Sequence, residues 1–427
     1  MKITRLADPC PACGLVLSRP ETDQPWCPAC EWNLGVYDPE MTPSRGWLWL
    51  ERLSHRLAYR WDGVLFARFS AERPSAPGWT PAHIALVAVS AVLLAVPLGL
   101  LVLGILVLRD FPSWQGVLGL VPLALAYALR PRFGRVPSGK FVVRRDQVPT
   151  LFALIDQVAE AVGAATPKVV VVDLDFNAAS GRTGVRRTSV LSIGAPLWAV
   201  LGPQERVALL AHELGHQVNG DPARGLLVRP ALTTFAALAR ATGVHRTIRD
   251  ITFSEDPYER VPLPVQLVLW VVSRIVLSVH FVLAALGQRD GQRSEYLADA
   301  VAVDVAGSAA TVALLDNLTV LPDVVRLLVH HAETKPAGEW RAMAASLYAN
   351  RQADMASLRQ LSTRRTSVWD SHPPNGLRAR MVEAWPHRDP VVVLTSVDSA
   401  RVDAELAGRY ARAHRAFLGA RDYRGPR

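Results

Sequence analysis

An uninterrupted run of apolar residues covers Ile84–Leu108 and contains no charged side chain. It is longer than the roughly 20 residues that a helix needs to cross a bilayer. A second apolar run, Gly116–Leu129, follows a short turn and is flanked by Trp114 and Tyr127, aromatic residues typical of a membrane interface. We predict a transmembrane hairpin over residues 81–131 and regard a buried helical hairpin as the less favoured interpretation.

Two later apolar stretches are interrupted by charge. Leu226–Gly243 contains Arg229 and Arg240, and Leu263–Gly287 contains Arg274. We predict further membrane helices at 226–243 and 263–287, with the arginines reaching the interface or facing the bundle interior. Buried helices are the alternative. If residues before and after these stretches share one site, the chain crosses the bilayer here twice or not at all.

Beyond the hairpin, the pattern of residues 140–427 is that of a folded domain. Pro149–Ala165 reads as an amphipathic helix. The β-branched runs Lys168–Leu174 and Thr188–Ile193 predict strands, and the polar stretch Asp175–Gly184 predicts a turn region between them. A further helix, Glu205–Gly220, is apolar nearly all round and is therefore expected to be buried. The predicted fold class is mainly α with a small β-sheet.

Charge favours a membrane partner over nucleic acid. The chain has 427 residues, half of them hydrophobic, and a net charge of +9 that arginine mostly supplies. A basic protein can bind nucleic acid or an anionic membrane surface, and the apolar runs favour the membrane. Basic residues flank both ends of the hairpin, so the positive-inside rule places both ends in the cytoplasm.

Residues 41–80 form a connector in which aromatic and basic side chains alternate. This composition is typical of a segment that lies at a membrane surface, and a solvated helix packing on its own domain is equally compatible with it. The alternating residues are Arg45, Trp47, Trp49, Arg52, Arg56, Arg60, Trp61, Phe66, Arg68 and Phe69.

All four cysteines lie in the first 30 residues, as the pairs Cys10–Cys13 and Cys27–Cys30. Two C-x-x-C turns at this separation predict a structural zinc ribbon over residues 1–40. Disulfides or a redox pair are the alternatives, and they are less favoured because no secretory signal precedes the cysteines, so we expect a reducing cytosol. Such ribbons bind proteins or nucleic acids or serve only folding, and a protein partner is the candidate here.

The strongest chemical motif is His212-Glu213-Leu-Gly-His216. On a helix the two histidines lie on one face, so both imidazoles can bind one Zn²⁺, while Glu213 can take a proton from a water molecule that the zinc activates. A lone match can occur by chance on a surface helix. The apolar flanks argue against that alternative, because a buried His or Glu needs a partner.

Two histidines leave the zinc short of one protein ligand. Glu295 and Asp299, four residues apart, share a face of another predicted helix. Glu295 is the candidate third ligand, and Asp299 is placed to accept the free N–H of a ligating histidine. Without the zinc motif, an ordinary helical acid pair would be the preferred interpretation.

The chain resembles the HtpX and CAAX prenyl protease family of integral-membrane zinc metallopeptidases, which are gluzincins. The resemblance lies in the stretch from His212 to Asp221, in the hydrophobic insertion after it, and in Glu295-Tyr-Leu-Ala-Asp299. The resemblance covers roughly Val142 to Arg380. It implies a gluzincin-like α+β protease core with membrane-embedded helices. It implies that Glu213 is the catalytic base and that the zinc ligands are His212, His216 and Glu295.

Two further segments resemble the same family. Asn177-Ala178-Ala-Ser-Gly181 matches a segment beside the edge strand of the active site, which implies substrate binding at Asn177 and Ala178 by strand addition. Ser371-His372-Pro-Pro-Asn-Gly-Leu-Arg378 matches a second motif. It implies that His372 contacts substrate or stabilises the oxyanion and that Arg378 supports it. Read alone, these segments are a turn and a loop histidine.

The sequence therefore predicts a multi-pass cell-membrane zinc endopeptidase with its ribbon and protease domain in the cytoplasm. It would use one catalytic and one structural Zn²⁺ and cleave protein or peptide substrates in quality control or regulated proteolysis. Nothing marks a prenyl-cysteine pocket. The alternative is a membrane-tethered ribbon module that binds protein or nucleic acid on a non-catalytic, metallopeptidase-like scaffold.

Overall fold

The computed structural model describes residues 3–21, 24–37, 48–74, 80–132, 135–184, 186–219, 221–241 and 263–419. Within these ranges the chain is mostly helical, with a two-stranded sheet near the N-terminus and a four-stranded sheet further along. The prediction of a mainly helical chain with a small sheet is confirmed. Part of the connector, with Arg45 and Trp47, lies outside the described residues, as do residues 244–262 between the two later apolar stretches.

The first elements are strands β1 (Ile3–Pro9) and β2 (Val16–Pro20), which pair antiparallel, and helix α1 (Leu48–Ala71). α1 buries one face, because Ser54, Ala58 and Asp62 recur every four residues on it and are fully buried. The helix packs against α10 and α14. Of the two interpretations of the connector, a surface segment at the membrane or a helix that packs on its own domain, α1 has the packing of the second.

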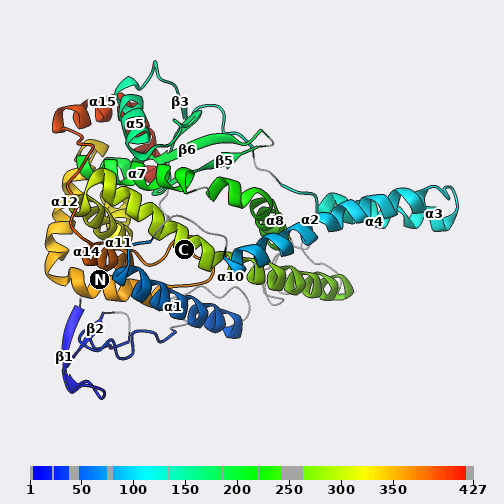
Figure 1. Cartoon of the computed structure of the whole chain (residues 1–427), viewed down its shortest axis with the longest axis horizontal. Coiled ribbons are helices and arrows are strands. Elements are labelled where there is room, and N and C mark those ends of the chain that lie inside the picture. The colour runs from blue at the N-terminus through cyan, green and yellow to red at the C-terminus, as the bar shows by residue number, and fades with distance from the viewer. Residues whose placement is uncertain are drawn as a thin grey trace.

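A helical hairpin projects from the rest of the molecule (Figure 1). Helix α2 (Pro81–Leu108) forms the first leg, and α3 (Trp114–Leu118) and α4 (Leu120–Ala128) form the second. The legs approach closely at glycine, since a Cβ on Gly104 would lie 2.6 Å from Leu123 Cγ. The return leg is shorter than the first: it covers Trp114–Ala128, whereas α2 covers Pro81–Leu108.

The larger sheet has the strand order β3-β4-β6-β5, with β4 and β6 parallel and the other pairs antiparallel. The prediction of a turn region over 175–184 is wrong in part, because Ala178–Thr183 pairs with β6 along its whole length. Its polar composition reflects its place at the sheet edge. The elements are β3 (Val142–Val143), α5 (Pro149–Val162), β4 (Val169–Asp173), β5 (Ala178–Thr183) and β6 (Thr188–Gly194).

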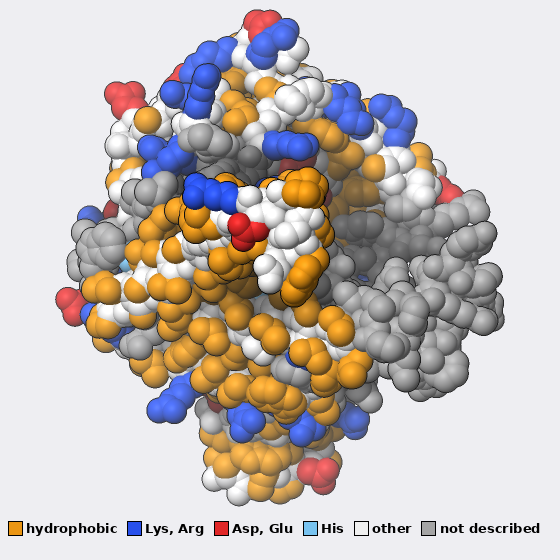
Figure 2. Space-filling model, turned by 90° about the vertical axis from the view of Figure 1, so that its right-hand side faces the viewer, with side chains coloured by type: hydrophobic (Ala, Val, Ile, Leu, Met, Phe, Trp, Pro, Cys, Tyr) orange, Lys and Arg blue, Asp and Glu red, His pale blue; other side chains and the backbone are white. Residues whose placement is uncertain are grey.

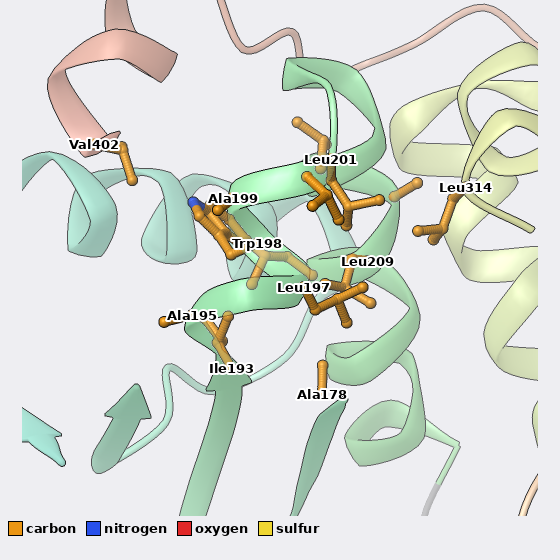
Figure 3. Packing of buried hydrophobic residues seen from close by; sticks show 14 of the residues in the cluster. Ala178, Ile193, Ala195, Leu197, Trp198, Ala199, Leu201, Leu209, Leu314 and Val402 are labelled. Carbon is orange, nitrogen blue, oxygen red and sulfur yellow. The ribbon is translucent and has the colours of Figure 1, made fainter. Parts of the chain in front are cut away.

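The end of β6 leads into the helix that carries the zinc motif. β6 passes directly into α6 (Ala195–Val200), which is buried along its whole length, and then into α7 (Pro203–Val218). Figure 3 shows Leu197 and Trp198 of α6 packed between the sheet and the neighbouring helices. This core holds α6 at the carboxyl end of β6, and α7 begins shortly after α6.

The remaining helices complete the domain. One of them, α10, joins two segments that the sequence analysis treated separately, the apolar stretch from residue 263 and the segment with Glu295 and Asp299. At 44 residues it is about 66 Å long. The helices are α8 (Asp221–Ala241), α10 (Leu263–Ala306), α11 (Ser308–His330), α12 (Trp340–Arg351), α13 (Met355–Ser362), α14 (Asn375–Ala384) and α15 (Ser396–Gly419). Short 3-10 helices cover Ala337–Glu339, Gln352–Asp354 and Thr363–Arg365.

Two described helices contain segments long and apolar enough to cross a membrane, His83–Leu108 in α2 and Trp270–Ala306 in α10. Leu227–Leu238 in α8 is shorter. Only 11% of the apolar window of α2 is buried. Figure 2 shows hydrophobic side chains spread over the projecting side of the molecule, so this face is suited to an apolar environment.

Candidate active site and metal centres

Local contacts of α7 hold its first turns. Glu205 accepts a hydrogen bond from the Gly202 backbone N–H at 2.8 Å, and this satisfies one of the free donors at a helix start. Arg206 is buried and donates to the Trp198 carbonyl at 2.8 and 3.0 Å and to Asp403 at 2.6 Å. α7 is thus tied to both α6 and α15 before it reaches the motif.

A glycine inside the motif lets α10 approach α7. A Cβ on Gly215 would lie 3.3 Å from the Cα of Ala298 and 3.2 Å from the Cβ of Val301, so a larger residue would press the two helices apart. The close crossing brings the Glu295 side of α10 against the histidine face of α7. Helix packing, rather than a loop, therefore sets the distance between the two halves of the site.

Glu295 lies between the two histidines of α7. Its Oε2 is 3.4 Å from His212 Nε2 and its Oε1 is 3.4 Å from His216 Nε2. Zinc binds nitrogen and oxygen donors at about 2.0 to 2.2 Å in tetrahedral geometry, which separates neighbouring donors by about 3.3 to 3.6 Å. The residues therefore fit a zinc ion in chemistry and spacing.

His372 contacts the same carboxylate. Its Nδ1 lies 2.7 Å from Glu295 Oε2, and its side chain is partly exposed. Ligand atoms of His212, Glu295 and His372 all lie within 4.8 Å of one another. A third imidazole is therefore present at the centre, on the side from which solvent or substrate reaches it.

Asp299 and Arg378 lie behind His212. Asp299 Oδ1 is 3.0 Å from His212 Nδ1, and Arg378 donates to both oxygens of Asp299 at 2.6 and 2.8 Å. All three side chains are buried. The contact between Asp299 and the imidazole orients the ring so that Nε2 faces Glu295.

The electrostatics of the site favour positive charge. Burial by itself disfavours a charged imidazole, but hydrogen bonds to Asp299 and Glu295 outweigh it and raise the pKa of His212 to about 10. Two carboxylates thus meet one imidazole in a buried place. A cation bound between them would be stabilised in the same way as the proton is.

Two serines at the site were missed by the sequence analysis. Ser294 Oγ lies 3.3 Å from His216 Nδ1, and Ser180 of β5 donates a hydrogen bond to the Glu213 carbonyl. The first contact gives His216 an oriented ring. The second ties the edge strand to α7. Ser294 adjoins Glu295 in the sequence, but serine is too common for that position to have been a signal.

A cavity of about 520 Å³ opens beside the site. Ala178, the first residue of β5, and Asn177 just before it line the cavity, as do Glu213 and His372. The predicted site residues are therefore brought together. An apolar wall that the sequence analysis missed comes from α6, α7, α11 and α13: Leu197, Leu209, Leu314, Leu318, Leu321 and Leu358.

The four cysteines form a second cluster, far from the first in sequence. They are free thiols whose Sγ atoms lie 3.7 Å apart in the pair Cys10–Cys30 and 3.5 Å apart in Cys13–Cys27. A disulfide requires about 2.05 Å, whereas sulfur donors about 2.3 Å from a tetrahedral zinc lie about 3.75 Å apart. The cluster therefore fits a metal ion better than disulfides.

Backbone N–H groups surround one thiol of this cluster. Burial would raise the pKa of Cys27, but the N–H groups of Cys30 and Ala29 lower it to about 7. A thiolate is the form that binds metal. The turn of the second C-x-x-C pair thus favours the ionised sulfur that a zinc site needs.

Comparison with known proteins assigns the domain to a family. A model described as peptidase family M48 matches residues 146–386, more than half of the chain. The HtpX homologue of Nitrosomonas europaea is 26% identical over 48% of this chain and 69% of its own length. HtpX of Pseudomonas putida is 27% identical over 40% of this chain and 56% of its own length, and HtpX of Vibrio parahaemolyticus is 26% identical over 50% and 72%.

No solved structure matches the chain significantly. The matched family segment begins just before α5 and ends after α14, so it contains both helices that meet at Glu295. The two C-x-x-C pairs and the helical hairpin precede it. This chain belongs to peptidase family M48, as an HtpX-like zinc metallopeptidase.

Proposed function

We propose that this protein is a membrane-anchored zinc endopeptidase that cleaves extended segments of protein substrates. The observation that carries the proposal is the position of Glu295 between His212 and His216, with Glu213 at the adjoining cavity. These three ligands, together with a neighbouring carboxylate base, suit peptide hydrolysis. The proposed division of the chain is a ribbon at 1–40, a connector at 41–80, a hairpin at 81–131 and the peptidase at 140–427.

The edge strand supports the way a substrate would bind. Among the strands of the described residues, β5 is the last in the sheet and pairs with β6 alone. An extended chain can add to such an edge through backbone hydrogen bonds. Asn177 and Ala178 lie at the end of the edge that reaches the cavity, so an added strand would run toward Glu213.

The proposed roles follow from the contacts. Bound zinc supplies a Lewis acid and lowers the pKa of water. His212, His216 and Glu295 would hold it. Glu213 takes a proton from the attacking water and delivers it to the leaving amine. His372 donates a hydrogen bond to the oxyanion.

Support for the metal ligands comes from the residues behind them. Asp299 accepts the Nδ1–H of His212, which leaves Nε2 directed at the metal position, and Ser294 does the same for His216. Arg378 fixes Asp299. The four-cysteine cluster would hold a second, structural zinc, which gives two ions per chain.

A membrane location is supported by the exposed apolar surface. We propose that the hairpin and the apolar parts of α8 and α10 lie in the bilayer, with both ends of the hairpin in the cytoplasm. On α10 the apolar part would end near residue 287, before Glu295.

A cysteine introduced at Asp110, at the hairpin tip, tests the orientation of the hairpin. Labelling of this cysteine by an impermeant thiol reagent added outside intact cells is expected, and labelling only after lysis would contradict the topology.

Activity and metal content test the proposed chemistry together. The wild type is expected to hold two zinc ions and to cleave casein or itself in detergent. Glu213→Gln should keep both ions and lose cleavage, whereas His212→Ala should lose one ion. An active Glu213→Gln variant would refute the role of Glu213. Wild-type protein with two ions and no cleavage of either substrate would favour the non-catalytic binding module. Protein quality control is the proposed cellular role.

A further inference from the structure

The four-cysteine module, defined as residues 3–37, is held to the peptidase domain by a buried arginine. Arg364 donates to three backbone carbonyls of the module: Gln24 at 2.8 Å, Asn33 at 2.9 Å and Leu34 at 3.4 Å. Its side chain is 4% exposed. Hydrogen bonds from a charged group are stronger than neutral ones, so these contacts fix the module at one position on the domain.

The neighbouring contacts use the backbone of the second C-x-x-C turn. Gln360 accepts from Trp26 Nε1 at 3.1 Å and donates to the Pro28 carbonyl at 2.9 Å. Trp26 and Leu34 are fully buried and pack with Leu361. Because Pro28 lies inside the turn between Cys27 and Cys30, the shape of this interface depends on the turn being folded around its metal.

The segment that follows Arg364 leads directly to the catalytic centre. Residues 366–374 form neither helix nor strand, so contacts with other elements must position them. His55 of α1 links the module to this segment, with its ring nitrogens 3.1 Å from the Gly35 carbonyl and 3.0 Å from the Thr366 carbonyl. Ser54 accepts from the Val368 N–H at 3.0 Å.

The far end of this segment carries the histidine of the site. Thr366, Asp370 and His372 line the 520 Å³ cavity, and His372 lies 2.7 Å from Glu295. His372 follows Arg364 by only eight positions in the chain. A shift of the module would therefore reach this segment through Arg364 and His55, because residues 366–374 have no regular structure and depend on contacts with other elements for their position.

We infer that the four-cysteine module positions His372 through Arg364, so that peptidase turnover depends on the metal held by the four cysteines. The inference rests on the proposed peptidase function. Arg364 is a positioning residue, since it acts through the 366–374 segment and touches neither the cavity nor the metal ligands in the described contacts.

Three variants of the full chain, purified in detergent, test the inference. Arg364→Ala removes the grip on the module, Cys13→Ser with Cys30→Ser removes its metal, and Arg401→Ala is the control because Arg401 is exposed on α15 and pairs with Asp398. The measurements are zinc per chain, kcat and KM on casein, and hydrogen exchange of residues 359–375.

Arg364→Ala is expected to keep two zinc ions, lose about 10-fold or more in kcat with KM changed less than about 3-fold, and exchange faster over 359–375. The cysteine variant should keep one zinc ion and show the same loss. The control should match the wild type. Arg364→Lys, which keeps the charge but not the forked donor, carries the test if the alanine variant does not fold.

A double-mutant cycle separates positioning from general weakening. In a His372→Ala background, Arg364→Ala should cost nothing further in kcat if it acts through His372. Additive losses would overturn the inference, as would full kcat in the cysteine variant with one zinc ion. An inactive wild type would instead contradict the proposed function, so the two failures are distinguishable.

Discussion

Arg378 donates hydrogen bonds to both oxygens of Asp299, at 2.6 and 2.8 Å, in a pair that is buried directly behind His212. The pair joins α14 to α10, and Asp299 in turn contacts the imidazole on α7 at 3.0 Å. One ion pair therefore joins the three helices around the metal position. Removal of the Arg378 side chain alone would leave the charge of Asp299 buried next to a metal ligand.

Replacing Arg378 by Met is expected to destabilise the protein by roughly 3 to 5 kcal/mol, because Asp299 would remain buried without its cation. Denaturant unfolding in detergent, followed by circular dichroism, measures the change. Arg401→Met is the matched control. Its ion pair with Asp398 is exposed, so its removal should cost less than about 1 kcal/mol. Equal stability of both variants would contradict the structural role of the buried pair.

Replacing Ser294 by Ala removes the hydroxyl 3.3 Å from His216 Nδ1. Residues that orient metal-bound histidines typically contribute about 10 to 100-fold to metal affinity. We expect a loss of zinc affinity of that size without loss of the fold, measured by competition with a chelator of known affinity. Ser346→Ala, on the exposed face of α12, is the control. Unchanged zinc affinity in Ser294→Ala would show that His216 does not need this contact.

Short-range patterns in the sequence singled out residues that the structure brings close together. The spacing of His212 and His216, and that of Glu295 and Asp299, places each pair on one helix face, and the structure brings the faces together. What spacing cannot supply is the crossing of the two helices. That crossing depends on Gly215, whose missing side chain lets Ala298 approach. Glu295 was the candidate third ligand because it shares a helix face with Asp299, and the family resemblance implies the same ligand.

Elements that depend on distant partners were harder to predict. β5 was interpreted as a turn because its side chains are polar, yet its backbone pairs with β6 from Ala178 to Thr183. The role of α1 depends on which surface covers it, and the sequence left that open. Arg364 carries no local signal at all, because the carbonyls that it contacts lie more than 300 residues earlier in the chain.

Asp62 of α1 gives the fold a pH dependence. It is 1% exposed and accepts hydrogen bonds from Gln292 and from Thr366 Oγ1. Burial raises its pKa from 3.8 to about 7, the hydrogen bond from Thr366 opposes this, and the charge of Asp370 adds to it. The folded state therefore binds this proton more tightly than the unfolded state, and the stability that it gives is lost as pH rises from about 4 to 7.

Asp62→Asn should remove this dependence. The variant is expected to gain on the order of 2 to 3 kcal/mol relative to the wild type between pH 5 and pH 8, because it never ionises. Comparing the two proteins at each pH cancels the other titrating groups. Chemical denaturation at both pH values measures the difference. A difference that is the same at both pH values would mean that Asp62 titrates normally.

Gly376, between His372 and Arg378, packs against α13 without room for a side chain. A Cβ there would overlap the backbone of Arg359, so Gly376→Ala must push α13 and α14 apart. Overpacking of this kind typically costs about 1 to 3 kcal/mol, and casein cleavage should fall because His372 and Arg378 move.

Gly408 is the matched control, since a Cβ there meets nothing within 4 Å and the residue lies within α15. Gly408→Ala should gain about 0.5 to 1 kcal/mol from helix propensity and keep full activity. If Gly376→Ala were as stable and active as Gly408→Ala, the contact between α13 and α14 would not hold the active-site segment.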